Sequence, residues 1–315
     1  MQMMARYWMS AAVLCSLSSL PLPAHAALVC EANIPSMDFG LISGSDGSSP
    51  QTSSPVTVSC YGGRPGAYVH ACLTIGSGSG TSGAGLTPRY MTGGEDAPLA
   101  YQLTSEAILS AGGTTWDMRA LRIALDDVTG SATVETTLYA EVASIGAQVT
   151  IGAYTSRFEA GTDVALSYGE DACDRSGATN TFTIDATVTP SCTVSVSNMD
   201  FGVIDAILAA PVEQIATISV SCTHGSAYTV GLDHGSNAVD AGPTGRRMAN
   251  EGDLLAYGLY HDNARLVDWG LAAGTVAAGT GTGANQALTV YGKIFLDQKA
   301  VVGTYFDSVV VIVSY

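Results

Sequence analysis

The sequence is poor in charged residues and almost free of lysine. Charged residues make up 13% of the 315 residues, against about 25% in ordinary soluble domains. With 12 basic and 28 acidic residues the net charge is −16, and only Lys293 and Lys299 are lysines. Proteins that bind nucleic acid need clustered Lys and Arg facing phosphates, and anionic membranes attract the same clusters. We therefore expect no nucleic-acid partner and no binding to an anionic membrane surface.

Long hydrophobic runs are also absent, except near the N-terminus. An apolar stretch at residues 11–22 follows Arg6, and an Ala-x-Ala site at residues 24–26 follows the stretch. The stretch is too short for a membrane anchor, which needs about 20 apolar residues. This pattern is typical of a secretory signal peptide, residues 1–26, with cleavage after Ala26. We expect an exported chain that does not span a membrane.

Cysteine is scarce, but its spacing is informative. Removal of the signal peptide leaves six cysteines, and an even number in an exported chain indicates disulfides. Six cysteines allow 15 pairings. Two intervals are equal, because Cys30 and Cys60 are 30 positions apart, as are Cys192 and Cys222.

The equal intervals belong to an internal repeat. At an offset of 162, Cys30 aligns with Cys192 and the Met-Asp-Phe-Gly segment at residues 37–40 aligns with residues 199–202. Later matches have smaller offsets, as for Trp116 with Trp269. The chain thus contains two copies of one domain. The simplest disulfide pairing is Cys30–Cys60 and Cys192–Cys222, with Cys72–Cys173 as an additional bond inside the first copy.

Both copies have the sequence pattern of β-strands. Short runs of alternating apolar and polar residues are separated by turns rich in Gly, Asp and Asn, and no long apolar stripe of helical period occurs after the signal peptide. We predict an all-β protein of two tandem β-sandwich domains, residues 27–180 and 181–315.

The segment between the two copies alternates without a break. One side carries Phe182, Ile184, Ala186 and Val188, and the other side is polar. This segment is either the first strand of domain two or a strand that completes domain one in cis. Domain one has no such segment before Cys30, and nothing follows the matching position in domain two. We therefore expect domain two to be an incomplete sandwich with an exposed groove, which accepts a strand from another chain.

The motifs of the second copy resemble those of the spore coat protein U domain. They run in order from Cys192 through residues 198–202, 255–260, 267–270 and 288–292 to residues 303–309. The first copy resembles the family more weakly. Members of this family are subunits of archaic chaperone–usher pili.

The resemblance implies several partners. In such pili each subunit is an incomplete immunoglobulin-like sandwich, and an N-terminal extension of one subunit completes the next. Assembly uses a periplasmic chaperone and an outer-membrane usher. The resemblance thus implies two tandem immunoglobulin-like sandwiches in a chain that passes through the periplasm and reaches the cell surface. A two-domain subunit without an extension implies a tip adhesin, which binds an abiotic or host surface, supports biofilm formation and receives a strand from the next pilin. The alternative is a non-tip tandem pilin or a spore-coat-like structural protein.

Catalytic and metal-binding patterns are weak, so we expect no enzyme, cofactor or metal. The Gly-x-Gly-x-x-Gly run at residues 78–83 precedes no helix pattern, and the two Asp-Phe-Gly triplets lack the other kinase motifs. His70 beside Cys72 could suggest a metal ligand, but a disulfide is the simpler role for Cys72. Asp126 and Asp127 are the best carboxylate pair for carbohydrate chemistry, although adjacent strand residues point to opposite faces.

For adhesion we considered apolar loops of domain one. Ile108 and Leu109 precede a Gly-Gly turn, and Ile145 lies in a second loop without regular alternation. Exposed apolar loop tips would favour attachment to apolar surfaces. Trp116, with Asp117 and Arg119, is the first candidate for a glycan site. For Trp116 we expect packing in the core of the sandwich, with the glycan site as the alternative. For the two loops, ordinary strand ends are the expected role, with adhesion as the alternative.

Overall fold

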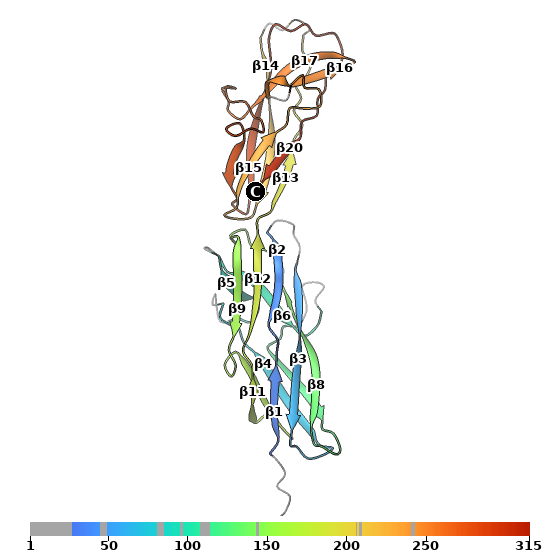
Figure 1. Cartoon of the computed structure of the whole chain (residues 1–315), viewed down its shortest axis with the longest axis vertical. Coiled ribbons are helices and arrows are strands. Elements are labelled where there is room, and N and C mark those ends of the chain that lie inside the picture. The colour runs from blue at the N-terminus through green and yellow to red at the C-terminus, as the bar shows by residue number, and fades with distance from the viewer. Residues whose placement is uncertain are drawn as a thin grey trace, which may run out of the picture.

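The computed structural model describes residues 27–44, 49–80, 85–94, 97–107, 114–142, 145–205, 207, 210–240 and 243–315. Within these residues the chain forms strands β1 to β20 and one 3-10 turn, η1 (Pro243–Gly245). The strands build two β-domains stacked end to end, with the N-terminal domain at the bottom of Figure 1. The all-β prediction with two tandem sandwich domains is confirmed. In the part of the chain described, no helix is both long and apolar enough to span a membrane.

Domain one is a single hydrogen-bonded sheet that curls around one hydrophobic core. Its strand order is β2-β12-β9-β5-β6-β8-β3-β1-β11-β10-β4-β7. Alternate residues of most strands are buried in this core, as the alternating sequence pattern predicts. The strands are β1 (Val29–Asn33), β2 (Met37–Ser43), β3 (Gln51–Tyr61), β4 (Tyr68–Ile75), β5 (Arg89–Gly93), β6 (Leu99–Thr104), β7 (Met118–Ala124), β8 (Ala132–Glu141), β9 (Gly152–Phe158), β10 (Val164–Gly169), β11 (Arg175–Thr179) and β12 (Phe182–Thr189).

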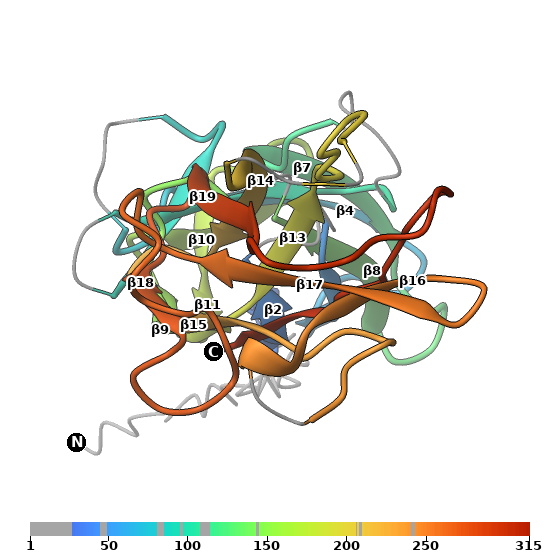
Figure 2. The ribbon, with the colours of Figure 1, turned by 90° about the horizontal axis from the view of Figure 1, so that it is seen from above.

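Domain two is built from two smaller sheets around its own core. The first sheet has the order β13-β14-β19-β17-β16 and the second has the order β18-β15-β20. Figure 2 shows these strands from above, over those of domain one. The strands are β13 (Cys192–Val196), β14 (Val212–Cys222), β15 (Ala227–Leu232), β16 (Arg247–Asn250), β17 (Asp253–Tyr260), β18 (Ala277–Thr280), β19 (Asn285–Ile294) and β20 (Val311–Ser314).

The three disulfides pair as the repeat predicts. Cys30–Cys60 and Cys192–Cys222 each join directly opposite residues of two antiparallel strands, with Cα atoms 4.1 Å apart in both cases. Cys72–Cys173 links β4 to the segment after β10 and closes a separation of 101 residues. The first two bonds therefore occupy the same place in the two domains, and the third belongs to domain one alone.

A buried arginine repeats in both domains, and the sequence analysis did not identify it. The Arg89 guanidinium donates to the carbonyl oxygens of Ile75, Gly76 and Trp116, and Arg246 donates to those of Leu232, Asp233 and Trp269. Both arginines are 0% exposed. Burial lowers the pKa of Arg89 to about 10. Each arginine thus ties three chain segments together by charge-assisted hydrogen bonds.

The boundary between the domains lies later than predicted. β12 is hydrogen-bonded in the sheet of domain one, so this domain extends to Thr189 and not to residue 180. Domain two begins at β13, after Pro190 and Ser191. The Thr223 hydroxyl accepts the Ser191 backbone N–H at 3.2 Å.

Domain one and domain two also touch beside this linker. Thr150 forms an isolated β-bridge with His224. A Cβ atom on Gly283, whose φ is +70°, would lie 1.8 Å from the carbonyl oxygen of Ala147. Glycine is therefore required at this close approach.

Candidate functional site

β12 fills a slot in domain one between β2 and β9. It runs parallel to β2 and antiparallel to β9, and Ile184 lies opposite Met37 on one side and Ser156 on the other. Phe182, Ile184, Ala186 and Val188 face inward and are 0–2% exposed. The cis strand predicted from the alternation is therefore present in domain one, and it closes the core of that domain.

The corresponding slot of domain two is not filled by any described part of the chain. The counterpart of β2 is residues 199–205 and the counterpart of β9 is residues 303–309, and neither forms a strand. The Met-Asp-Phe-Gly motif is identical in both copies, yet it is a strand only in domain one. A strand needs a hydrogen-bonding partner on at least one side, and β12 supplies that partner in domain one alone.

The two segments that border the empty slot still have the local structure of their counterparts. Gly40 and Gly202 both have positive φ, and each donates its N–H to the aspartate two residues earlier. The hydroxyl of Tyr154 bonds to the backbone N–H and carbonyl of Thr150, and Tyr305 makes the same two bonds to Val301. Both segments are therefore held by hydrogen bonds that do not involve a strand in the slot.

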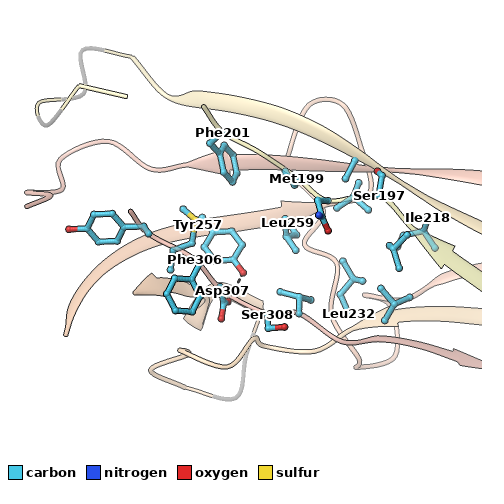
Figure 3. A pocket seen from close by; sticks show the side chains of 18 residues that line it. Ser197, Met199, Phe201, Ile218, Leu232, Tyr257, Leu259, Phe306, Asp307 and Ser308 are labelled. Carbon is cyan, nitrogen blue, oxygen red and sulfur yellow. Dashed lines mark hydrogen bonds between the residues drawn. The ribbon is translucent and has the colours of Figure 1, made fainter. Parts of the chain in front are cut away.

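The empty slot is a groove with a volume of about 590 Å³, and most of the side chains that line it are apolar. Figure 3 shows its side chains converging from both border segments and from the core strands. One border contributes Met199 and Phe201, and the other contributes Tyr305, Asp307 and Val309. The floor includes Ala216, Ile218, Leu232, Tyr257, Leu259 and Val290.

The border residues are less buried than their counterparts in domain one. Met37, Tyr154 and Phe158 are 3%, 1% and 0% exposed, whereas Met199, Tyr305 and Val309 are only partly buried against the core of domain two. Unfilled edges of this kind present apolar side chains together with unpaired backbone N–H and C=O groups. The groove thus fits an added strand by its shape and by its chemistry.

One polar pair lies in the groove. The Tyr257 hydroxyl donates to Asp307 Oδ2 at 2.6 Å, as the dashed line in Figure 3 marks. Asp307 Oδ1 accepts the backbone N–H groups of Ser236 and Asn237 at 2.9 and 3.2 Å. Burial first, and then the bond to Asp307, raise the pKa of Tyr257 above its ordinary value. The sequence analysis did not identify this pair. The sequence marks it through one difference between the copies, an aspartate at Asp307 where domain one has Ser156.

The predicted adhesion residues do not form one site. Trp116 is 2% exposed and its indole packs in the core of domain one, as expected, so Trp116 as a candidate for an exposed glycan or adhesion site is wrong. Ile145 is partly buried against that core, and its loop reaches domain two near Gly283. It is therefore not a tip residue. Ile108 and Leu109 lie outside the described residues.

Asp126, one of the two carboxylates considered for carbohydrate chemistry, has a structural role. Asp126 accepts hydrogen bonds from the backbone N–H groups of Val128 and Thr129, and these bonds hold its pKa below the ordinary value. It therefore organises the turn between β7 and β8. Among the described residues, no group of three or more His, Cys, Asp or Glu side chains could hold a metal ion.

Comparison with known proteins identifies the family. The model of the Spore Coat Protein U domain matches residues 14–160 and again residues 178–312. The chain belongs to this family and carries its domain twice. The chain is also 33% identical over 129 residues to Protein U of Myxococcus xanthus. This match covers 39% of this chain and 72% of Protein U.

One solved structure supports the two-domain fold. One similar chain lies in the crystal structure of the CsuC–CsuE chaperone–tip adhesion subunit pre-assembly complex, from archaic chaperone-usher Csu pili of Acinetobacter baumannii. The TM-score is 0.51 at 16% identity, and the match covers 90% of this chain and 100% of that chain. The CupB6 tip adhesin from Pseudomonas aeruginosa matches with a TM-score of 0.33 at 12% identity, over 91% of this chain and 94% of that chain.

Proposed function

We propose that this protein is the tip adhesin subunit of an archaic chaperone–usher pilus, where it mediates surface attachment and biofilm formation. The observation that carries the proposal is the groove of domain two, which has the same borders as the slot that β12 fills in domain one. A neighbouring pilin donates the strand that fills this groove. Domain two is thus the docking domain and domain one is the attachment domain.

The mechanism is strand addition. The donated strand pairs its backbone with the open border segments, and its alternate side chains enter the groove. The backbone hydrogen bonds supply affinity, and the fit of the inward side chains supplies specificity. Because apolar side chains line the groove, a subunit in transit through the periplasm needs a chaperone that covers them. An outer-membrane usher then exchanges the chaperone for a pilin.

The place at the tip follows from the proposed signal cleavage after Ala26. Leu28 is 7% exposed in the core of domain one, and β1 pairs with β3 from Val29 onward and with β11 at Glu31 and Ala32. A mature chain that starts at Ala27 therefore keeps its first residues inside its own sheet and has no segment to donate. Mass spectrometry of the mature N-terminus tests the cleavage site.

The attachment surface is proposed for domain one. Ile108 and Leu109 remain candidates. At the end of this domain that points away from domain two, Val128 and Tyr61 are 83% and 46% exposed. Burying such residues against an abiotic or host surface would release ordered water. Replacing Val128 and Ile108 by Ser should lower attachment to an apolar surface without loss of fibres.

Fibre incorporation tests the docking role. Val309→Arg places a charge in the groove, whereas Val310→Arg places the same charge on the neighbouring residue, which is 56% exposed and faces outward. We expect the first variant to be missing from purified fibres and the second to be incorporated. Equal incorporation of both variants would contradict strand addition at this groove.

A second candidate is a non-tip tandem pilin or a spore-coat-like structural protein, which the similarity to Protein U favours. Stoichiometry separates the two roles. Immunogold labelling of domain one should mark one end of each fibre if the protein is a tip adhesin. Labels along the whole fibre would support the structural role instead.

A further inference from the structure

Domain one provides a template for the register of the strand that domain two receives. In domain one, Ile184 of β12 lies opposite Met37 on β2 and opposite Ser156 on β9. Met37 aligns with Met199, and Ser156 aligns with Asp307, because Tyr154 and Tyr305 make the same hydrogen bonds two residues earlier. Both Met199 and Asp307 line the groove. In this register, the residue that takes the place of Ile184 lies between them.

The residue at this place differs in chemistry between the domains. In domain one, Ser156 is 0% exposed beneath β12, with the buried Tyr101 as its polar neighbour. In domain two the same place holds a carboxylate. An apolar residue can cover a serine at modest cost, but it would remove water from the oxygens of Asp307 and leave them with fewer hydrogen bonds.

The hydrogen bonds of Asp307 leave one of its oxygens able to accept more. Oδ1 accepts three donors, the backbone N–H groups of Ser236 and Asn237 and the Asn237 side-chain amide. Oδ2 accepts the Tyr257 hydroxyl. Each carboxylate oxygen has two lone pairs, so Oδ2, which accepts a single donor, can accept a second one from a group that enters the groove.

We propose that the strand that completes domain two carries a hydrogen-bond-donating side chain opposite Asp307. Its inward residues on either side, opposite Tyr305 and Val309, are apolar like Ala186 and Phe182. Asp307 is thus a specificity-determining residue for the incoming strand. This inference rests on the proposed docking role, and it adds a chemical preference at one position.

Two peptides that differ by one hydroxyl group test the preference. Both have the sequence of residues 181–190, with either Thr or Val at the position of Ile184, since these side chains have the same shape. Binding to the full-length protein is measured by fluorescence anisotropy of labelled peptide. Leaving a buried charged acceptor short of a donor costs tenfold or more in affinity, so we expect the Thr peptide to bind at least about tenfold more tightly.

The Asp307→Ser variant, which places the domain-one residue in the groove, is the matched control. We expect the preference for the Thr peptide to disappear in this variant. Equal binding of both peptides to the unaltered protein, or tighter binding of the Val peptide, would overturn the inference while leaving strand addition intact. Binding of neither peptide would overturn strand addition and the inference with it.

A disulfide trap tests the register separately. Thr183 lies opposite Arg157 in domain one, so the same peptide position lies opposite Ser308 in domain two. Directly opposite cysteines already form cross-strand disulfides in this protein, as Cys192 and Cys222 do. In a glutathione buffer, Ser308→Cys should capture a peptide with Cys at the position of Thr183 in preference to one with Cys at the position of Asp185. Equal or reversed capture would contradict the register.

Discussion

Phe158 on β9 and Phe182 on β12 stack with their ring centroids 4.6 Å apart and their planes 6° apart. This contact packs Phe182, the first residue of β12, against the core of domain one. The counterpart of Phe158 in domain two is Val309, which lines the open groove. This border position thus faces a residue of β12 in domain one and faces the open groove in domain two.

Removing the stacked ring should destabilise domain one. Phe182 is 1% exposed, and Phe→Ala changes in cores cost about 3–5 kcal/mol. We expect Phe182→Ala to lower the free energy of unfolding of domain one by this amount in urea denaturation. Thr187→Ala, on the other face of the same strand, is the control and should cost less than about 1 kcal/mol. Equal effects would show that β12 is not a core strand of domain one.

The disulfide that only domain one has should stabilise only that domain. Cys72–Cys173 closes a separation of 101 residues, and loss of such a bond typically costs about 2–5 kcal/mol. Replacing both cysteines by Ala should lower the melting temperature of domain one in calorimetry and leave the transition of domain two unchanged. A shift in both transitions would mean that the domains unfold as one unit.

The buried arginine of domain two should be essential to its stability. Arg246→Met leaves the carbonyls of Leu232, Asp233 and Trp269 without their shared donor, and we expect a loss of at least about 3 kcal/mol in chemical denaturation. Arg247→Met, at a partly exposed neighbour, should cost less than about 1 kcal/mol. A cost below 1 kcal/mol for Arg246→Met would contradict the structural role.

Alkaline pH should remove a contribution that Tyr257 makes to the stability of domain two. Burial raises the pKa of Tyr257 above the ordinary value of about 10. A group whose pKa is raised on folding stabilises the folded protein below its unfolded pKa, and this stabilisation is lost as the pH rises further. The contribution of Tyr257 to the free energy of unfolding should therefore fall above about pH 10. In Tyr257→Phe, domain two should lose less stability per pH unit than in the unaltered protein; an unchanged slope would contradict this assignment.

The sequence predicted the large features because each leaves a periodic or repeated signal. The equal cysteine intervals indicated the repeat and two of the disulfides. The unbroken alternation around Ile184 predicted a strand, and the ends of the two copies pointed to its place in domain one. Residues 199–202 and 37–40 share one motif, however, and only the second forms part of a strand. Strand formation depends on a partner strand, which a local pattern does not encode.

The details of the site were not predictable from one sequence. Arg89 and Arg246 bind carbonyl oxygens of distant segments, which leaves no local signal. Irregular alternation makes Ile145 a candidate surface residue, and the neighbours Asp117 and Arg119 make Trp116 a candidate glycan site. The fold buries Trp116 and brings the loop of Ile145 to domain two.

Amide hydrogen exchange of the assembled protein tests the central claim, that domain two is completed by a strand from another chain. Exchange is compared between the purified full-length protein and the same protein in its fibres, in peptides that cover residues 152–158 and 303–309. The first segment is already paired with β12 and should be protected in both states. We predict that residues 303–309 become protected only in fibres. Equal exchange of residues 303–309 in both states would contradict the claim.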